Sequence, residues 1–554
     1  MESASIHSYR VGVRARRLIG ALVAVTALSL VLDARLAIGA NGANGSANAA
    51  AGIGTAAALK ASSCDPETER IKIPTILAPP CVKPLNGKGN GGSTAQGVTK
   101  DTIKVAVLIG TEEADRRTTS GGLRDLSTGQ PGLESRGVED ANAVYAHAYE
   151  TWGRTVVFDY ITATGTDEAA QRADALAVGA RKPFAVLCAA CFISGAGGGA
   201  IFNEALVSQN IPAVEVPSKA AETTAPFNAI IAEFIGKSLA GRKARWAGDA
   251  ALKTQERKFG VVFSPGDDGT DIAAFQKALK KWGAPKAVEV EYVPPLDVSQ
   301  SASAAQQAAP TLVAKLKDEG VTTVIPLTSP TILTQSLTKA ATANSYFPEW
   351  MIRPLQDLDF YARQFDQQQW AHAFGPVWFA PYVESASDPI IAVFEWYWGK
   401  QRGTYSAGQF TAMRQLYTGI MLGGPNLTRE SFYAGLEAFP GGGGACSNHV
   451  TSQCTHLKAP RSIAPQVEAA IGWYDPTVTG IPSQSTRTAG TGKLRYMNNA
   501  KRYLPGDLPK GEPDLFNPAV AITHLPSIPA GEQVTAYPCT GCPSAGGPGT
   551  PSTA

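Results

Sequence analysis

Two cysteines with two residues between them, Cys188 and Cys191, have the spacing of a dithiol redox centre. An apolar run at 184–188 leads into them, and a glycine cluster at 195–199 follows them. Three kinds of chemistry suit this pattern: thiol–disulfide exchange, metal binding, and a disulfide that stiffens a ligand-binding loop. The choice between them depends on the elements around the pair.

A second candidate cluster combines Cys446, His449, Cys454 and His456, which are residue types that bind zinc. Their spacing fits no common zinc pattern, so we favour a disulfide between the two cysteines. The eight cysteines of the chain form four close pairs, which are typical of local disulfides in an exported protein. The four pairs are Cys64 with Cys81, Cys188 with Cys191, Cys446 with Cys454, and Cys539 with Cys542. Spacing does not prove this connectivity, because eight cysteines allow about 105 pairings.

The N-terminal residues have the pattern of an export signal. Four arginines between Arg10 and Arg17 precede the uncharged run 18–32, and small residues follow in "AIGANGANG". An apolar run of 15 residues is shorter than the roughly 20 needed to span a bilayer. We therefore predict a signal peptide over residues 1–40 and a periplasmic or extracellular protein. If the signal were not cleaved, the N-terminal segment would keep the protein at the membrane.

Composition restricts the classes of function. Of its residues, 44% are hydrophobic and 17% are charged. A chain of 554 residues is too long for a single core, so we predict at least two lobes. Its net charge of +2 does not favour nucleic acid as a partner. The sequence contains no nucleophile elbow, HExxH or phosphate-loop motif, so we expect a non-enzyme without metal or cofactor.

Strand-forming and helix-forming segments alternate through the middle of the chain. Apolar strands are predicted at 101–110, 155–161, 184–188 and 211–216, with a helix pattern between successive strands. The same alternation repeats from 223 to 370. Short connections between strands and helices predict an α/β fold with two parallel sheets, each covered on both faces. Residues 41–100 have the composition of a Gly/Ala/Pro-rich linker, and residues 516–554 that of a disordered tail.

Several stretches of this sequence resemble the type I periplasmic binding proteins, in the leucine/isoleucine/valine-binding branch. They are "GVTKDTIKVAVLIG", "WAGDAALKTQERKFGVV", "KFGVVFSPGDDGTDIAAFQKALKKWG" and "GVTTVIPLTSPTILTQSLTKAATANSYFPEWMI". The resemblance covers about residues 97–510. It implies two doubly wound parallel-sheet lobes joined by a three-strand hinge. On this basis residues 101–222 with 371–470 form lobe I, and residues 223–370 with 471–515 form lobe II.

The resemblance also places a ligand in the loops that follow the strands, which is where open parallel sheets bind ligands. The candidate ligand-binding residues are Thr111, Glu112, Phe192, Ser194, Ser218, Lys219, Asp268, Thr328, Ser329 and Gln356, and Asp357 is offered beside Gln356 in the same stretch. Two of them depart from the family pattern. Lys219 is either a solvated lysine or a group that selects an acidic ligand. Asp268 stands where the family often carries an aromatic residue, and it either holds an ammonium group or caps a helix.

The resemblance implies that the protein captures an amino acid or similar small polar solute by hinge closure and delivers it to the membrane subunits of an ABC transporter. In this setting a Cys188–Cys191 disulfide stiffens the loop beside the ligand. One alternative hypothesis is an exported thiol–disulfide oxidoreductase that uses Cys188 and Cys191. Another is a ligand-sensing receptor without transport.

Overall fold

The computed structural model describes residues 50–543, apart from 86, 88, 110–132, 166, 189–199, 215–219, 266–270, 296–299, 328–330, 354–355, 385–388, 400–406, 438–449, 451–467 and 485–487. The predicted signal peptide therefore lies outside the described residues. No helix in the described part of the chain is both long and apolar enough to cross a bilayer.

The first sheet has four parallel strands in the order β4-β3-β5-β6. They are β3 (Thr102–Ile109), β4 (Thr155–Thr162), β5 (Ala185–Cys188) and β6 (Ala213–Val214). Its central strand is buried on both faces: Val105 and Val107 belong to one apolar cluster, while Ala106 and Leu108 belong to another. Consecutive side chains of a strand point to opposite faces, so the apolar run produces a sheet with a core on each side.

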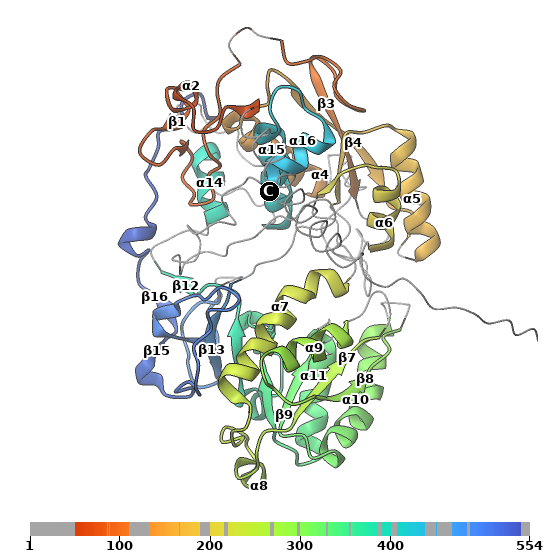
Figure 1. Cartoon of the computed structure of the whole chain (residues 1–554), viewed down its shortest axis with the longest axis vertical. Helices are drawn as coiled ribbons and strands as arrows, with labels where there is room; N and C mark the ends of the chain where they lie inside the picture. The colour runs from red at the N-terminus through yellow and green to blue at the C-terminus, as the bar shows by residue number, and fades with distance from the viewer. Residues whose placement is uncertain are drawn as a thin grey trace, which may run out of the picture. The chain divides into compact units, whose positions relative to one another are not determined.

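Helices cover both faces of this sheet (Figure 1). One core contains residues of α5 (Glu168–Ala180) and α6 (Ala200–Ser208). The other contains residues of α4 (Leu133–Ala148), α14 (Pro389–Trp398), α15 (Ala407–Gly423) and α16 (Arg429–Glu437). The first unit is thus completed by helices that lie more than 170 residues after its last strand.

The second sheet has eight strands in the order β15-β14-β13-β11-β10-β9-β7-β8. Five are parallel: β7 (Phe259–Phe263), β8 (Val288–Glu291), β9 (Thr323–Pro326), β10 (Glu349–Met351) and β11 (Ala373–Val377). Three follow in antiparallel pairing: β13 (Ala470–Asp475), β14 (Lys493–Met497) and β15 (Ala521–Ile522). Val261 and Val262 of β7 again belong to different cores.

The second sheet is also covered on both faces. One core contains residues of α7 (Ala220–Phe234), the π-helical turn η1 (Ile235–Leu239) and α9 (Ile272–Lys281). The other contains residues of α10 (Ser301–Asp318), α11 (Thr331–Ala343) and α13 (Gln367–Trp370). Short helices α8 (Ala250–Lys253) and α12 (Asp359–Ala362) lie in the connections.

The parallel strands of the two sheets follow the same order. In both, the first strand lies between the second and the third, as β4-β3-β5-β6 and β8-β7-β9-β10-β11 show. This is a doubly wound order with a switch point between the first and third strands. The predicted α/β fold class with two doubly wound parallel sheets is confirmed.

The predicted division into lobes needs a correction at β11. Residues 371–470 were expected in the first lobe, but Ala373 pairs with Trp350 of β10 and Val377 pairs with Ala470 of β13. This buried segment extends the second sheet because its backbone completes the ladder beside β10. The helices α14, α15 and α16 do pack in the first unit. The remaining lobe boundaries stay a prediction.

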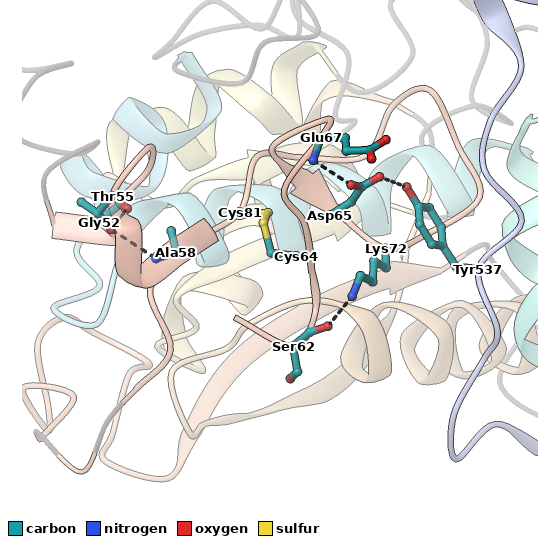
Figure 2. The surroundings of a disulfide bond; sticks show 10 residues. All are labelled: Gly52, Thr55, Ala58, Ser62, Cys64, Asp65, Glu67, Lys72, Cys81 and Tyr537. Atoms are coloured by element: carbon teal, nitrogen blue, oxygen red, sulfur yellow. Dashed lines mark hydrogen bonds between the residues drawn. A yellow bond between two sulfur atoms is a disulfide. The ribbon is translucent and has the colours of Figure 1, made fainter. Parts of the chain in front are cut away.

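The expected linker is wrong for residues 50–100. This segment contains the short helix α2 (Ala56–Leu59) and the two-stranded pair β1 (Cys64–Asp65) and β2 (Arg70–Ile71). Ile71 and Ile73 are buried in the first core, and Cys64 is bonded to Cys81 (Figure 2). A few spaced apolar residues and one disulfide anchor a segment whose Pro and Gly content is typical of a linker.

The expected disordered tail is wrong for residues 516–543. β15 completes the second sheet, and β16 (His524–Leu525) pairs with β12 (Tyr382–Val383). Further on, the Tyr537 hydroxyl donates to Asp65 Oδ2 at 2.6 Å (Figure 2). Trp396 Nε1 donates to the Tyr537 carbonyl at 2.9 Å. The tail thus returns to the first unit, which adds a fourth passage between the units to the three that the resemblance implies.

Candidate ligand-binding edge of the second sheet

The parallel strands β8, β7, β9, β10 and β11 all end at one edge of the second sheet, called here the carboxyl edge. Open α/β sheets bind ligands beyond this edge, at the switch point, which here lies between β7 and β9. Ser264 follows β7, Arg353 follows β10 by two residues, and Trp378 follows β11. Polar atoms at this edge are therefore candidates for contact with a ligand.

Arg353 places a cation at the switch point. Its side chain is 5% exposed, and its Nη1 donates to the carbonyl of Pro326, the last residue of β9, at 3.2 Å. Its Nε has no hydrogen-bond partner, and no carboxylate forms an ion pair with it, among the described residues. Burial lowers the pKa of Arg353 to about 10, so the guanidinium still carries its charge at neutral pH.

Asp357 places a carboxyl group at the same edge. Its Oδ2 accepts hydrogen bonds from the backbone N–H groups of Trp378 and, at 3.0 Å, Phe379. Its Oδ1 has no partner within the described residues. Burial raises the pKa of Asp357 to about 7, against the lowering effect of those N–H groups and of Arg502. The group therefore gains or loses a proton near neutral pH.

Three further side chains present unused polar atoms here. Gln356 donates from Nε2 to Thr334 Oγ1 at 2.8 Å. The ring of Trp378 lies 3.6 Å, centroid to centroid, from Phe227 of α7. In the described part of the chain no partner is found for five buried atoms of this edge: Ser264 Oγ, Arg353 Nε, Gln356 Oε1, Asp357 Oδ1 and Trp378 Nε1. Buried polar groups are normally paired, so these atoms mark a candidate binding site.

Two residues predicted from the sequence, Gln356 and Asp357, lie at this edge. The others lie outside the described residues: Thr111, Glu112, Phe192, Ser194, Ser218, Lys219, Asp268, Thr328 and Ser329. They stay predictions, as does the binding role of Gln356. The sequence reasoning missed Ser264, Arg353 and Trp378. Their position directly after apolar strands is the signal that could have found them.

Two of the four predicted cysteine pairs are confirmed, Cys64 with Cys81 and Cys539 with Cys542. The Cys188 side chain, Cys191 and the pair Cys446 with Cys454 lie outside what the structure describes. Disulfides at those positions stay predictions.

Comparison with known proteins gives structural neighbours only. No protein-family model and no curated protein sequence matches this chain. A type 1 periplasmic binding protein from Bordetella pertussis Tohama I is similar with a TM-score of 0.42 and 12% identity, over 71% of this chain and 100% of its own. An ABC transporter solute-binding protein from R. palustris, solved with 4-hydroxybenzoate, has a TM-score of 0.40 and 15% identity, over 77% of this chain and 98% of its own. A fatty acid ABC transporter substrate-binding protein from Thermomonospora curvata has a TM-score of 0.40 and 11% identity, over 79% of this chain and 97% of its own.

Proposed function

We propose that this chain is an exported solute-binding protein of an ABC transporter, and that its ligand is a small organic anion. The observation that carries the proposal is Arg353, a buried guanidinium at the switch point of the second sheet with a donor left unused among the described residues. A buried cation without a carboxylate partner is costly, and an anionic ligand would offset that cost.

The surrounding groups suit an organic carboxylate. Charge-assisted hydrogen bonds from a guanidinium are among the strongest in proteins, and two parallel ones fit a carboxylate. The neighbouring rings of Trp378 and Phe227 offer an apolar surface for the rest of the molecule. Gln356 and Ser264 add an acceptor and a hydroxyl. An amino acid or another small carboxylate matches this set.

The mechanism we propose is hinge closure. The predicted residues of the first unit, such as Ser218 and Lys219, would meet the ligand as the two units close, and the bound form would be recognised by the transporter's membrane subunits. The structural neighbours are binding proteins rather than enzymes. The alternative, an oxidoreductase that uses Cys188 and Cys191, stays a hypothesis, because the Cys188 side chain and Cys191 lie outside the described residues.

A thermal-shift screen of the full chain tests the function. The panel pairs carboxylates with amides that lack the charge: leucine with leucinamide, and benzoate with benzamide, together with glutamate and decanoate. A ligand at 100 times its dissociation constant stabilises the fold by about 2.7 kcal/mol. We expect at least one carboxylate to raise the unfolding temperature and its amide to leave it unchanged. A panel without any shift would contradict the proposed function.

Substitution of Arg353 by Met tests the site. Loss of the charge-assisted hydrogen bonds should weaken the best carboxylate by about 10- to 100-fold in calorimetry. Arg363→Met is the matched control, because Arg363 donates to the carbonyls of Gly492 and Thr488 away from this edge. Equal affinity of Arg353→Met and wild type would show that the ligand binds elsewhere.

A further inference from the structure

A cysteine–histidine cluster lies in the first unit, apart from the carboxyl edge of the second sheet. His147, near the end of α4, places its Nε2 3.5 Å from Cys542 Sγ and 3.8 Å from Cys539 Sγ. The three ligand atoms all lie within 4.8 Å of one another. The sequence gives no hint of this grouping, because His147 and the cysteines are almost 400 residues apart.

The two distances from His147 to the sulfurs fit the geometry of a tetrahedral metal centre. Zinc binds thiolate sulfur at about 2.3 Å and imidazole nitrogen at about 2.1 Å, so two such ligands in a tetrahedron lie about 3.6 Å apart. The two distances from His147 to the sulfurs, 3.5 and 3.8 Å, bracket this value.

Packing holds the cluster in place. Tyr537, two residues before Cys539, is fixed to Asp65 and Trp396. The loop between the cysteines turns at Gly541, whose φ of +79° favours glycine. Gly541 also lies next to the imidazole, since a Cβ at this position would be 3.8 Å from His147 Cε1. These contacts bring both sulfurs close to one imidazole nitrogen without any contribution from a metal.

Aromatic side chains support the imidazole from another element. The rings of Trp396 and Tyr397, on α14, lie 6.0 and 5.3 Å from the ring of His147, centroid to centroid. Cys542 is 6% exposed, whereas His147 is exposed. A metal ion held here would therefore face solvent on the histidine side, where water or another ligand can complete a fourth position.

We propose that Cys539 and Cys542 in their reduced form bind Zn²⁺ or a similar thiophilic divalent ion together with His147. The ligand set, two cysteines and one histidine with an open position, is known for zinc. The site is redox-sensitive, because the structure joins the two sulfurs in a disulfide. A dithiol reductant supplies two electrons and two protons, the S–S bond breaks to give two thiols, and the metal ion then displaces the two thiol protons.

Zinc stoichiometry of the full chain tests the proposal. Protein reduced with dithiothreitol and freed of it without oxygen should bind one more equivalent of zinc than the Cys539→Ser/Cys542→Ser variant. The difference isolates this pair from the other six cysteines. Oxidation of the wild type with diamide should abolish binding of this additional zinc equivalent. Equal stoichiometry in the wild type and the double variant would overturn the proposal.

Cobalt as a spectroscopic probe tests the role of His147. Co²⁺ in the reduced wild type should show thiolate charge-transfer absorption and the intense visible bands of a tetrahedral ion. His147→Gln should change these bands and weaken binding by at least about tenfold, since even loss of an outer-shell partner costs roughly 10- to 100-fold. His524→Gln, at a partly exposed contact with Glu384, is the control and should match the wild type. An unchanged spectrum in His147→Gln would exclude the histidine as a ligand.

Discussion

At the amino edge of the second sheet, Arg257 and Glu349 form a two-point ion pair at 2.8 and 2.9 Å, with both side chains fully buried. Thr323 donates to the same carboxylate at 2.7 Å, and Glu512 accepts from the remaining arm of Arg257 at 2.7 Å. At the carboxyl edge, Arg353 is almost as buried, yet its only hydrogen bond among the described residues goes to a backbone carbonyl. Within the described residues, an arginine is paired with two carboxylates at one edge and with none at the other.

The difference separates a structural role from a binding role. Each buried polar group left without a partner costs about 1–3 kcal/mol, so an edge that contains several of them lowers the stability of the fold. Exceptions to local packing rules concentrate at functional sites. We therefore infer that the amino edge stabilises the sheet, whereas the carboxyl edge keeps polar atoms available for a ligand.

The largest expected effect is at the amino edge. Glu349→Ala leaves a buried guanidinium without its main partner, and should lower the free energy of unfolding by about 3–5 kcal/mol. Urea denaturation followed by circular dichroism measures this loss. Glu319→Ala is the control, because Glu319 and its partner Lys258 are each 50% exposed, and it should stay within about 0.5 kcal/mol of the wild type. If Glu349→Ala lowered the free energy of unfolding by less than about 1 kcal/mol, the amino edge would not have the stabilising role that distinguishes it from the carboxyl edge.

The next effect is a pH dependence at the carboxyl edge. The pKa of Asp357 is raised from 3.8 to about 7 in the folded chain, so the native state holds this proton more tightly than the unfolded state. The carboxyl therefore lowers stability as the pH rises from 4 to 7, and its full cost remains above pH 7. Asp357→Asn has no charge to bury, and should stabilise the fold by about 2–4 kcal/mol at pH 8.

The pH profile is the check on that prediction. Denaturant unfolding at pH 4 should give nearly equal stabilities for the wild type and Asp357→Asn, with the gap opening up to pH 7. Asp366→Asn, the same change of side chain at the half-buried N-cap of α13, is the matched control. A gap of constant size between pH 4 and pH 8 would mean that Asp357 is ionised in the folded protein at all of these values.

The sequence predicted the sheets well because periodicity is a local signal. Apolar runs such as 103–109 fix a buried strand, and their alternation with helices fixes a doubly wound order. β11 was assigned to the wrong lobe because its place depends on pairing with β10, which is not local. The same holds for residues 50–100 and for the tail, where single contacts such as Tyr537 with Asp65 decide the path of the chain.

The candidate site shows the same limit. The loops after the strands were predicted as ligand-binding from the family resemblance, and Gln356 was named among them. Arg353 was not selected, because its candidate role rests on two observations that the sequence does not contain. Its Nη1 donates to the carbonyl at the end of β9, and its Nε has no hydrogen-bond partner among the described residues. A sequence shows which side chains follow a strand, but burial and pairing at a sheet edge depend on several segments at once.

The smallest expected effect is also the most direct comparison, because it removes one hydroxyl from each edge. Thr323→Val deletes a donor to the buried carboxylate of Glu349 and should cost about 1.5–3 kcal/mol in urea denaturation. Ser264→Ala deletes a buried hydroxyl for which no partner is found in the described part of the chain. It should therefore be neutral or stabilise by up to about 1 kcal/mol, because nothing is lost and the desolvation cost disappears. Equal losses in the two variants would mean that Ser264 is already paired within the protein, and would leave one atom fewer for a ligand.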